Sequence, residues 1–281
     1  MLCAVVALST GNLPSSHPAA RVARLLGLGA DGLALGPHAR DRDLLAGGVP
    51  RGRIGFVAVL VPGGLRICAT DRHELREAIR VASIEIDRAN HLECPNVVVE
   101  LGALEAGLGP RWLDLLDAFA RGRLEREVRD AFVASRRALV ERHLDAARRS
   151  LDVLLPLAER RGSALGLLPA PSGDALGLAD EIHALGRDYD GAPLAPWRAT
   201  DRQHRLRMLS LAGSRPPAAA AGAIAADAAG LVGGLPPGSA EVDWSSALAG
   251  LAPGAPCVLQ AELATEGELS RALEFLRGKE G

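Results

Sequence analysis

Aromatic residues are scarce in this sequence and make up 3% of its 281 residues. Proteins that bind single-stranded nucleic acids stack the bases on aromatic side chains, so the composition argues against that class. The formal net charge is −2, which leaves no overall positive charge for binding the phosphates of a duplex. We therefore predict that nucleic acid is not a partner.

Lysine is almost absent, because Lys279 is the only one in the chain. Schiff-base catalysis and phosphate-binding P-loops both need a lysine inside the fold. Lys279 follows the last predicted helix, at residues 266–276, and is badly placed for either role. These two kinds of site are therefore excluded.

The four cysteines form no CxxC pair, and no histidine lies at metal-ligand spacing from them. We expect small buried thiols in a reducing, cytoplasmic compartment. No apolar run approaches the roughly 18 residues that a membrane-spanning helix needs, so we predict no membrane association. The apolar start, residues 2–8, is interpreted as a buried strand rather than as a signal peptide.

Short apolar segments alternate with longer amphipathic segments. The predicted strands are residues 2–8, 31–35, 53–61, 96–101, 164–168, 194–200 and 256–262. The predicted helices are residues 18–26, 72–90 (capped by Asp71), 112–120, 124–161, 174–187 and 266–276. Continuous apolar strands between helices indicate a parallel sheet covered by helices. We predict an α/β fold with a single domain over residues 1–281, namely a closed (β/α)8 TIM barrel.

Three segments of the second half are harder to interpret. Residues 207–212 are predicted as a strand, and residues 233–238 as a Gly/Pro loop. Residues 217–231 (PPAAAAGAIAADAAG) are predicted either as a helix on a closely packed face or as a mobile segment, and they are also a candidate surface for a protein partner. Asp243 is expected to cap a helix over residues 245–251, with Trp244 packing the loop down.

Five segments carry a resemblance to a known family. They are ADGLALG at 30–36, residues 70–102, residues 150–170, GGLPPGSAEVDWSSALAGL at 233–251, and residues 256–277. In this order they resemble the xylose isomerase-like TIM barrels, the sugar phosphate isomerase/epimerase superfamily. The resemblance implies a divalent metal held by Glu, Asp, His and Glu at the carboxyl ends of the strands. It also implies metal-assisted proton transfer next to a carbonyl group of a sugar or polyol.

The ligand positions of the family are changed in this chain. Leu168 stands where the fifth strand normally ends in Glu, Gln260 replaces the Glu of the closing strand, and Gly234 replaces a His. The family's sixth-strand motif is D-x-G-H, and it can be aligned with this sequence in two ways. One keeps Asp201 and His204 as D-x-x-H. The other keeps Trp197 of a W-x-D-x-G-H pattern and places Ala199 and Arg202 at the ligand positions.

The candidate site residues follow from strand ends and from this resemblance. The candidate catalytic residues are Glu100, Asp201 and His204. The candidate substrate-binding residues are His38, Arg202, Gln260 and Glu262. For Asp201 and His204 the alternative is a solvent-facing loop within the arginine-rich stretch at 198–207. For Glu100 it is a structural hydrogen bond, for His38 an incidental loop position, and for Glu262 a solvent-facing strand end.

Two functions remain open at this point. The first is a divergent or inactive relative, a pseudoenzyme that keeps the barrel as a binding module and needs no cofactor. The second is an active isomerase or epimerase that uses a divalent metal and the surviving residues. A metal-independent enzyme using Glu100 or the arginines is a smaller third alternative. In each case the expected partner is a small sugar or polyol, and the sequence does not identify a protein partner.

The charged stretch at 121–149 mixes arginines with acidic residues at helical spacing. Such mixing is typical of a solvated helix with ion pairs between neighbouring turns. We therefore expect this stretch to face water rather than nucleic acid.

Overall fold

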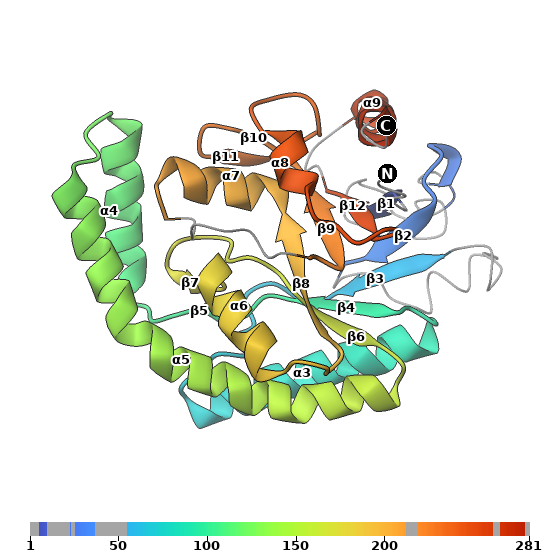
Figure 1. Ribbon diagram of the computed structural model, residues 1–281, viewed down its shortest axis with the longest axis horizontal. Helices are drawn as coiled ribbons and strands as arrows, with labels where there is room; N and C mark the ends of the chain where they lie inside the picture. Colours follow the sequence, from blue (N-terminus) through green and yellow to red (C-terminus); the bar gives the residue numbers. More distant parts are fainter. Residues whose placement is uncertain are drawn as a thin grey trace.

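The computed structural model describes residues 6–9, 23, 26–36, 55–211, 219–260 and 265–278 of the chain. Eight parallel strands close into a barrel in the order β1-β12-β9-β8-β6-β4-β3-β2 (Figure 1). They are β1 (Val6–Ser9), β2 (Gly32–Leu35), β3 (Phe56–Leu60), β4 (Asn96–Val99), β6 (Ala164–Leu167), β8 (Leu194–Ala199), β9 (Gly222–Ala225) and β12 (Cys257–Leu259). The ring closes where β1 pairs with both β2 and β12. The predicted (β/α)8 barrel is therefore confirmed.

The helices lie on the outside of this ring (Figure 1). They are α3 (Arg72–His91), α4 (Leu108–Ala120), α5 (Arg126–Arg160), α6 (Ala179–Asp188), α7 (Thr200–Met208), α8 (Trp244–Leu248) and α9 (Glu266–Gly278). The second half of α5 runs beside α3, whereas α4 and the first half of α5 project away from the barrel. Two small antiparallel pairs, β5 (Gly102–Ala103) with β7 (Ala175–Leu176) and β10 (Asp227–Ala229) with β11 (Val232–Leu235), complete the fold.

Several helix ends are encoded locally, as predicted. The Asp71 carboxylate accepts hydrogen bonds from the backbone N–H groups of His73 and Glu74, which otherwise lack partners at a helix start. Gly162 follows α5 with a φ of +71°, a conformation that a residue with a Cβ rarely adopts. Asp243 caps α8 in the same way as Asp71 caps α3.

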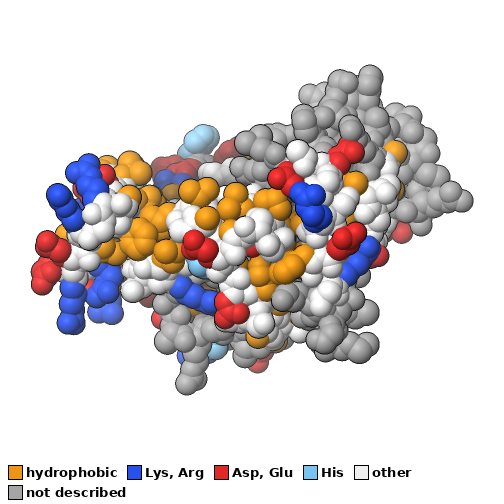
Figure 2. All heavy atoms as spheres, turned by 90° about the horizontal axis from the view of Figure 1, so that it is seen from above, with side chains coloured by type: hydrophobic (Ala, Val, Ile, Leu, Met, Phe, Trp, Pro, Cys, Tyr) orange, Lys and Arg blue, Asp and Glu red, His pale blue; other side chains and the backbone are white. Residues whose placement is uncertain are grey.

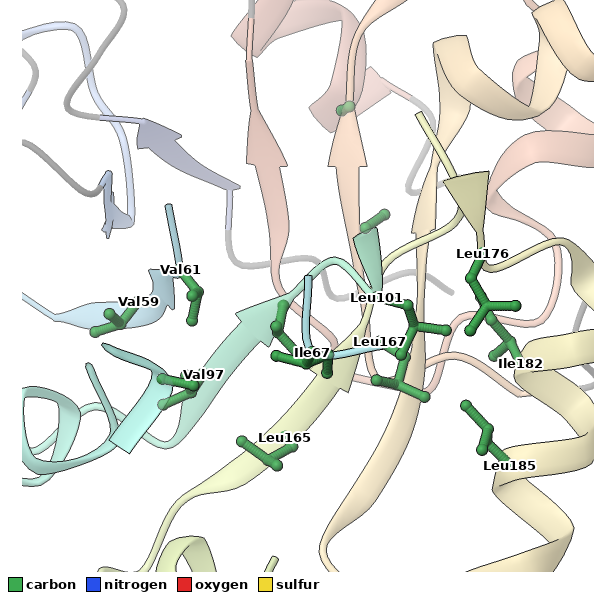
Figure 3. Close-up of a cluster of buried hydrophobic side chains, with 14 of the residues drawn as sticks. Val59, Val61, Ile67, Val97, Leu101, Leu165, Leu167, Leu176, Ile182 and Leu185 are labelled. Carbon is green, nitrogen blue, oxygen red and sulfur yellow. The ribbon is translucent and has the colours of Figure 1, made fainter. Parts of the chain in front are cut away.

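The strands separate two apolar cores because their side chains alternate. In β4, Val97 and Val99 face the helices, and Val98 faces the inside of the barrel. Figure 3 shows part of the outer core, with Val97 and Leu165 on neighbouring strands and Ile182 and Leu185 on α6. The inner core is smaller and consists of Ala34, Ala58, Val98, Leu168, Trp197, Ala199, Ile224 and Val258.

Trp197 is the largest side chain of the inner core within the described part of the chain, and it is fully buried. It points from β8 between glycines of the two adjacent strands. A Cβ atom at Gly222 would lie 2.7 Å from the indole, and one at Gly166 would overlap it. The indole therefore fits only because β6 and β9 each lack a side chain beside it.

This packing explains why the predictions for residues 217–231 are wrong. The described part of that segment forms β9 and β10, not a helix or a mobile segment, and Ala223, Ala225 and Ala228 are fully buried. At Gly222 a side chain is excluded by the indole of Trp197, whereas the three alanines face the outer core. The segment therefore offers no exposed apolar surface for a partner over these buried residues.

Other elements differ from the predictions in their limits. Residues 207–211 are not a strand, because the chain turns into α7 directly after β8 and α7 continues to Met208. The predicted helix at 174–187 begins only at Ala179, because Ala175 and Leu176 pair with β5 instead. Half of the predicted loop at 233–238 belongs to β11.

The mixed charges of α4 and α5 form the expected ion pairs. Arg121 pairs with Asp117, and Arg126 with Asp130, each four residues apart and exposed. Figure 2 shows basic and acidic side chains together at the end of the molecule formed by α4 and the start of α5. No helix within the described ranges has an apolar stretch long enough to cross a membrane.

Candidate functional site

A cavity of about 290 Å³ opens at the carboxyl ends of β6, β8, β9 and β12. This end of a TIM barrel holds the active site in enzymes of this architecture, because the loops after the strands converge there. Pro171 follows β6, and Ala226 and Gln260 follow β9 and β12. The lining residues are Pro171, Asp201, Arg202, Arg205, Ala226, Gly233, Gly234 and Gln260.

Arg202 connects the loops that follow three adjacent strands. Its Nη2 donates to Oε1 of Glu100 over 2.6 Å, and its Nη1 donates to the carbonyl oxygen of Pro169 over 3.1 Å. The two side chains are 17% and 20% exposed, so the ion pair is largely removed from water. Partial burial strengthens the attraction between the charges compared with a surface pair.

Asp201 and Arg205 form a second pair one helical turn apart on α7, with 3.4 Å between Oδ2 and Nη2. The hairpin of β10 and β11 lies against this pair at Gly233. A Cβ atom there would overlap Oδ2 of Asp201 and would lie 3.1 Å from Nε of Arg205. Gly233 therefore lets the hairpin cover the pair closely.

The other predicted site residues are distributed as follows. Gln260 lines the cavity, and its backbone N–H donates to Ala225 at the end of β9. His204 does not line the cavity, and its Nε2 lies 3.7 Å from Oε2 of Glu241. His38 and Glu262 lie outside the described residues. The structure thus brings Asp201, Arg202 and Gln260 together, with Glu100 behind Arg202.

The arginine-rich stretch is not simply a solvent-facing loop. Arg198 is only 1% exposed, and it donates to the carbonyl oxygens of Ser246 and Ala247 in α8. Burial lowers the pKa of Arg198, and the nearby charge of Arg207 acts in the same direction. Arg207 itself is exposed. Arg198 therefore anchors α8 against the outer face of β8.

The residues that the structure describes at the mouth do not form a binding site for a divalent cation. Leu168 and Ala199 belong to the apolar core inside the barrel and offer no ligand atom. Glu100 and Asp201 each face an arginine. Within the described ranges there is no group of three or more His, Cys, Asp and Glu side chains that could hold a metal ion. Divalent cations need several oxygen or nitrogen ligands around one point, and this donor set does not supply them.

Asp227 is a residue that the sequence analysis missed. It is fully buried, and its carboxylate accepts from the backbone N–H groups of Ala228, Gly238, Ala240 and Val242 and from the indole N–H of Trp244. It thereby fixes the loop over residues 236–244 beside the mouth. The sequence signal that could have identified it was a single acidic residue within an alanine-rich strand. If such a strand is buried, its carboxylate must be hydrogen-bonded, which predicts a structural role.

No protein-family model matches the sequence, and a search of curated proteins finds no match. Solved structures do match. A D-tagatose 3-epimerase-like protein is 14% identical, with a TM-score of 0.67 over 97% of this chain and 96% of that one. A 3-keto-D-glucoside 4-epimerase from E. coli is 12% identical, with a TM-score of 0.68 over 98% and 99%.

A xylose isomerase domain protein from Planctomyces limnophilus is 14% identical, with a TM-score of 0.60 over 99% of this chain and 96% of that one. The chain has the xylose isomerase-like TIM-barrel fold. At these identities the likeness establishes the fold of this barrel and not its reaction. The chemistry must therefore be argued from the mouth itself.

Proposed function

We propose that this xylose isomerase-like barrel is a divergent relative that binds a sugar or polyol at its mouth and has lost metal-dependent catalysis. The observation that carries the proposal is the ion pair between Arg202 and Glu100. It places a guanidinium group, paired with its own carboxylate, at the end of the barrel where the family resemblance implies a metal ion.

The alignment anchored on Trp197 supports this proposal. It assigns the two ligand positions to Ala199 and Arg202. Ala199 ends β8 with its side chain in the inner core, and Arg202 reaches the mouth. Glu100 and Asp201 are each paired with an arginine, so a divalent cation would have to displace a guanidinium group to reach either carboxylate.

The class of ligand is proposed from the lining and from the neighbours. Sugars are recognised by hydrogen bonds to their hydroxyl groups, and the lining offers Asp201, two arginines and Gln260. Two of the similar structures are a D-tagatose 3-epimerase-like protein and a 3-keto-D-glucoside 4-epimerase. A small polyhydroxylated molecule is therefore the ligand that we propose.

The competing proposal is an active, metal-assisted epimerase that uses Glu100, Asp201 and His204. The arrangement favours it less. Both carboxylates face arginines, and His204 lies beside Glu241 rather than in the cavity. A proton-transfer pair needs to reach one bound substrate from within hydrogen-bonding distance.

The test is the metal content of purified protein, followed by thermal unfolding of EDTA-treated protein titrated with Mn²⁺, Co²⁺, Zn²⁺ and Mg²⁺. We expect no retained metal and no shift in melting temperature. Retention of about one equivalent, with a melting shift that Asp201→Ala abolishes and Arg149→Gln on the exposed face of α5 does not, would overturn the proposal. That outcome would support the competing proposal of an active, metal-assisted epimerase.

A further inference from the structure

His143 lies in the middle of α5 and is fully buried. Its Nδ1 lies 2.7 Å from the carbonyl oxygen of Cys68, which follows β3 in the chain. A carbonyl oxygen only accepts, so Nδ1 carries the hydrogen and the neutral imidazole has its lone pair on Nε2. Nε2 is buried, and no hydrogen-bond partner for it is found among the described residues. A proton added at Nε2 is therefore a buried donor without an acceptor.

The charged groups around this imidazole do not compensate a second positive charge. Burial is the main cause that lowers the pKa of His143, and Arg66, after β3, and Arg142, on α5, lower it further. The hydrogen bond to the carbonyl oxygen and the charge of Glu105 act in the opposite direction. Glu105 is already paired with Arg142, and Arg66 is paired with Glu74 of α3 at 3.2 Å. Both carboxylates thus already have a guanidinium partner.

Residues 65–69, called the β3 segment below, are attached to α5 at two places. His143 is one of them. Ser150, two helical turns further along α5, donates to the carbonyl oxygen of Ile67 over 2.6 Å. The β3 segment belongs to neither a helix nor a strand. A segment without a backbone ladder of its own opens more easily than the helix on which it packs, so it is the part that gives way when His143 is charged.

The β3 segment is also joined to the segment that follows β4. The backbone N–H of Cys68 donates to the carbonyl oxygen of Leu101 over 3.1 Å. The guanidinium group of Arg66 donates to the carbonyl oxygens of residues 103–104. Glu100, which forms the ion pair at the mouth, directly precedes this second segment. Opening of the β3 segment therefore removes support from the loop that carries Glu100.

We propose that His143 is a pH-sensitive switch: protonation at Nε2 releases the β3 segment from α5 and loosens residues 101–104 beside Glu100. The proton comes from water that enters as the segment opens. In the open state the imidazolium is hydrated, and water screens it from the two arginines. The open state binds the proton more tightly than the closed state, so opening is favoured as the pH falls. The inference does not depend on which ligand the mouth binds.

The thiol of Cys68 reports on this opening. It is fully buried, and burial raises its pKa to about 12, so it stays neutral and protected in the closed state. The experiment labels the protein with 4,4′-dithiodipyridine, and peptide mapping by mass spectrometry separates the cysteines. Each rate is divided by the rate for the unfolded chain at the same pH, which removes the pH dependence of the reagent. Cys94 and Cys257, both 2% exposed, are internal controls.

Between about pH 7.5 and about pH 5 we expect the normalised labelling of Cys68 to rise about tenfold or more. Opening to the ordinary histidine pKa of 6.5 allows a rise of at most about 30-fold at pH 5. Labelling of Cys94 and Cys257 should rise much less, because neither lies on the two segments. Amide hydrogen exchange over residues 101–104, corrected for its intrinsic pH dependence, should rise together with the labelling of Cys68.

Three variants separate the switch from a merely structural role. His143→Gln should make the labelling of Cys68 nearly independent of pH, because glutamine can donate to the same carbonyl oxygen but takes up no proton. Ser150→Ala removes the other attachment and no titrating group, so it should raise the labelling by a similar factor at both pH values. His183→Gln, at an exposed position of α6, should leave the rise unchanged. Melting temperatures show whether each variant folds, and the wild-type and Ser150→Ala profiles decide if His143→Gln does not.

The other outcomes overturn the inference in distinguishable ways. Equal labelling of Cys68 at both pH values contradicts the opening. A rise that persists in folded His143→Gln assigns the effect to another group. An equal rise at Cys68, Cys94 and Cys257 shows that the whole barrel unfolds in acid. Unchanged exchange over residues 101–104 contradicts the link to the mouth. None of these results bears on sugar binding or on metal content, which the earlier assay measures.

Discussion

Nη2 of Arg202 lies 2.6 Å from Oε1 of Glu100, although the two residues are 102 positions apart in the chain. The pair connects the end of β4 to the start of α7 across the intervening strand β6. Glu100 would be a reasonable metal ligand or general base if it were alone. In this arrangement its charge is used to hold a guanidinium group at the mouth.

If metal binding was lost through ligand replacement, restoring the ligands should bring it back. The variant combines Leu168→Glu, Ala199→Asp, Arg202→His and Gln260→Glu, the family's residues at these positions. We expect it to retain about one equivalent of Mn²⁺ or Co²⁺ and to melt at a higher temperature with metal than without. Metal content by mass spectrometry and thermal unfolding measure both effects.

A matched control keeps Arg202 and makes the other three changes. It should bind metal more weakly, because the guanidinium group still occupies the mouth. Equal metal binding by both variants would show that Arg202 does not exclude the cation.

The fit of Trp197 predicts a destabilising effect of one added methyl group. Gly166→Ala should lower the free energy of unfolding by about 1–3 kcal/mol, because its Cβ overlaps the indole in the inner core. Gly186→Ala is the control, since nothing lies near its Cβ position in α6 and alanine favours helix. Denaturant titration measures both. A Gly166→Ala protein as stable as wild type would contradict the packing.

The five hydrogen bonds to Asp227 predict a strong effect of an isosteric change. Asp227→Asn places an amide group where several N–H groups converge, and this should cost about 1–3 kcal/mol in unfolding free energy. Asp243→Asn should be nearly neutral, because asparagine and aspartate cap helices equally well. The comparison by denaturant titration, followed through tryptophan fluorescence, separates the effect of the buried carboxylate of Asp227 in β10 from that of the exposed carboxylate of Asp243.

His143 predicts a dependence of stability on pH. It is fully buried on α5, and its Nδ1 lies 2.7 Å from the carbonyl oxygen of Cys68. Burial lowers the pKa of His143 below its usual value of 6.5, with Arg66 and Arg142 adding to the effect. The folded protein therefore binds fewer protons here than the unfolded chain, so this contribution to stability is present above pH 6.5 and is lost as the pH falls below it.

We expect His143→Gln to flatten the fall in unfolding free energy between about pH 7 and pH 5. His183→Gln, which changes an exposed histidine on α6, should leave the pH profile unchanged. An unaltered profile in His143→Gln would show that other groups cause the acid destabilisation.

Most of the barrel could be predicted because apolar strands and amphipathic helices have different periods. The strand at 164–168, the helix at 124–161 and the Asp71 cap were all readable from local sequence. Residues 217–231 were misinterpreted because alanine favours helices, while the need for a glycine at 222 comes from Trp197 on the adjacent strand. That contact joins residues distant in sequence and leaves no local pattern.

The same limit applies to the mouth. Glu100 and Arg202 were each identified as candidates, but nothing in the sequence pairs residues so far apart. Asp201 and Arg205 are one helical turn apart, yet the stretch was not predicted as a helix, so their pairing was missed. Local sequence patterns located the ends of the strands. Which charged side chains pair at those ends depends on how the strands are ordered around the barrel.

A positive charge that belongs to the polypeptide differs from a bound ion in where it comes from. Arg202 is in place as soon as the chain has folded, whereas a metal ion must be taken up, and chelators or competing metals can exchange it. The charge at this mouth therefore stays constant when the metal content of the surroundings changes. On the function proposed above, such a barrel remains complete under metal starvation.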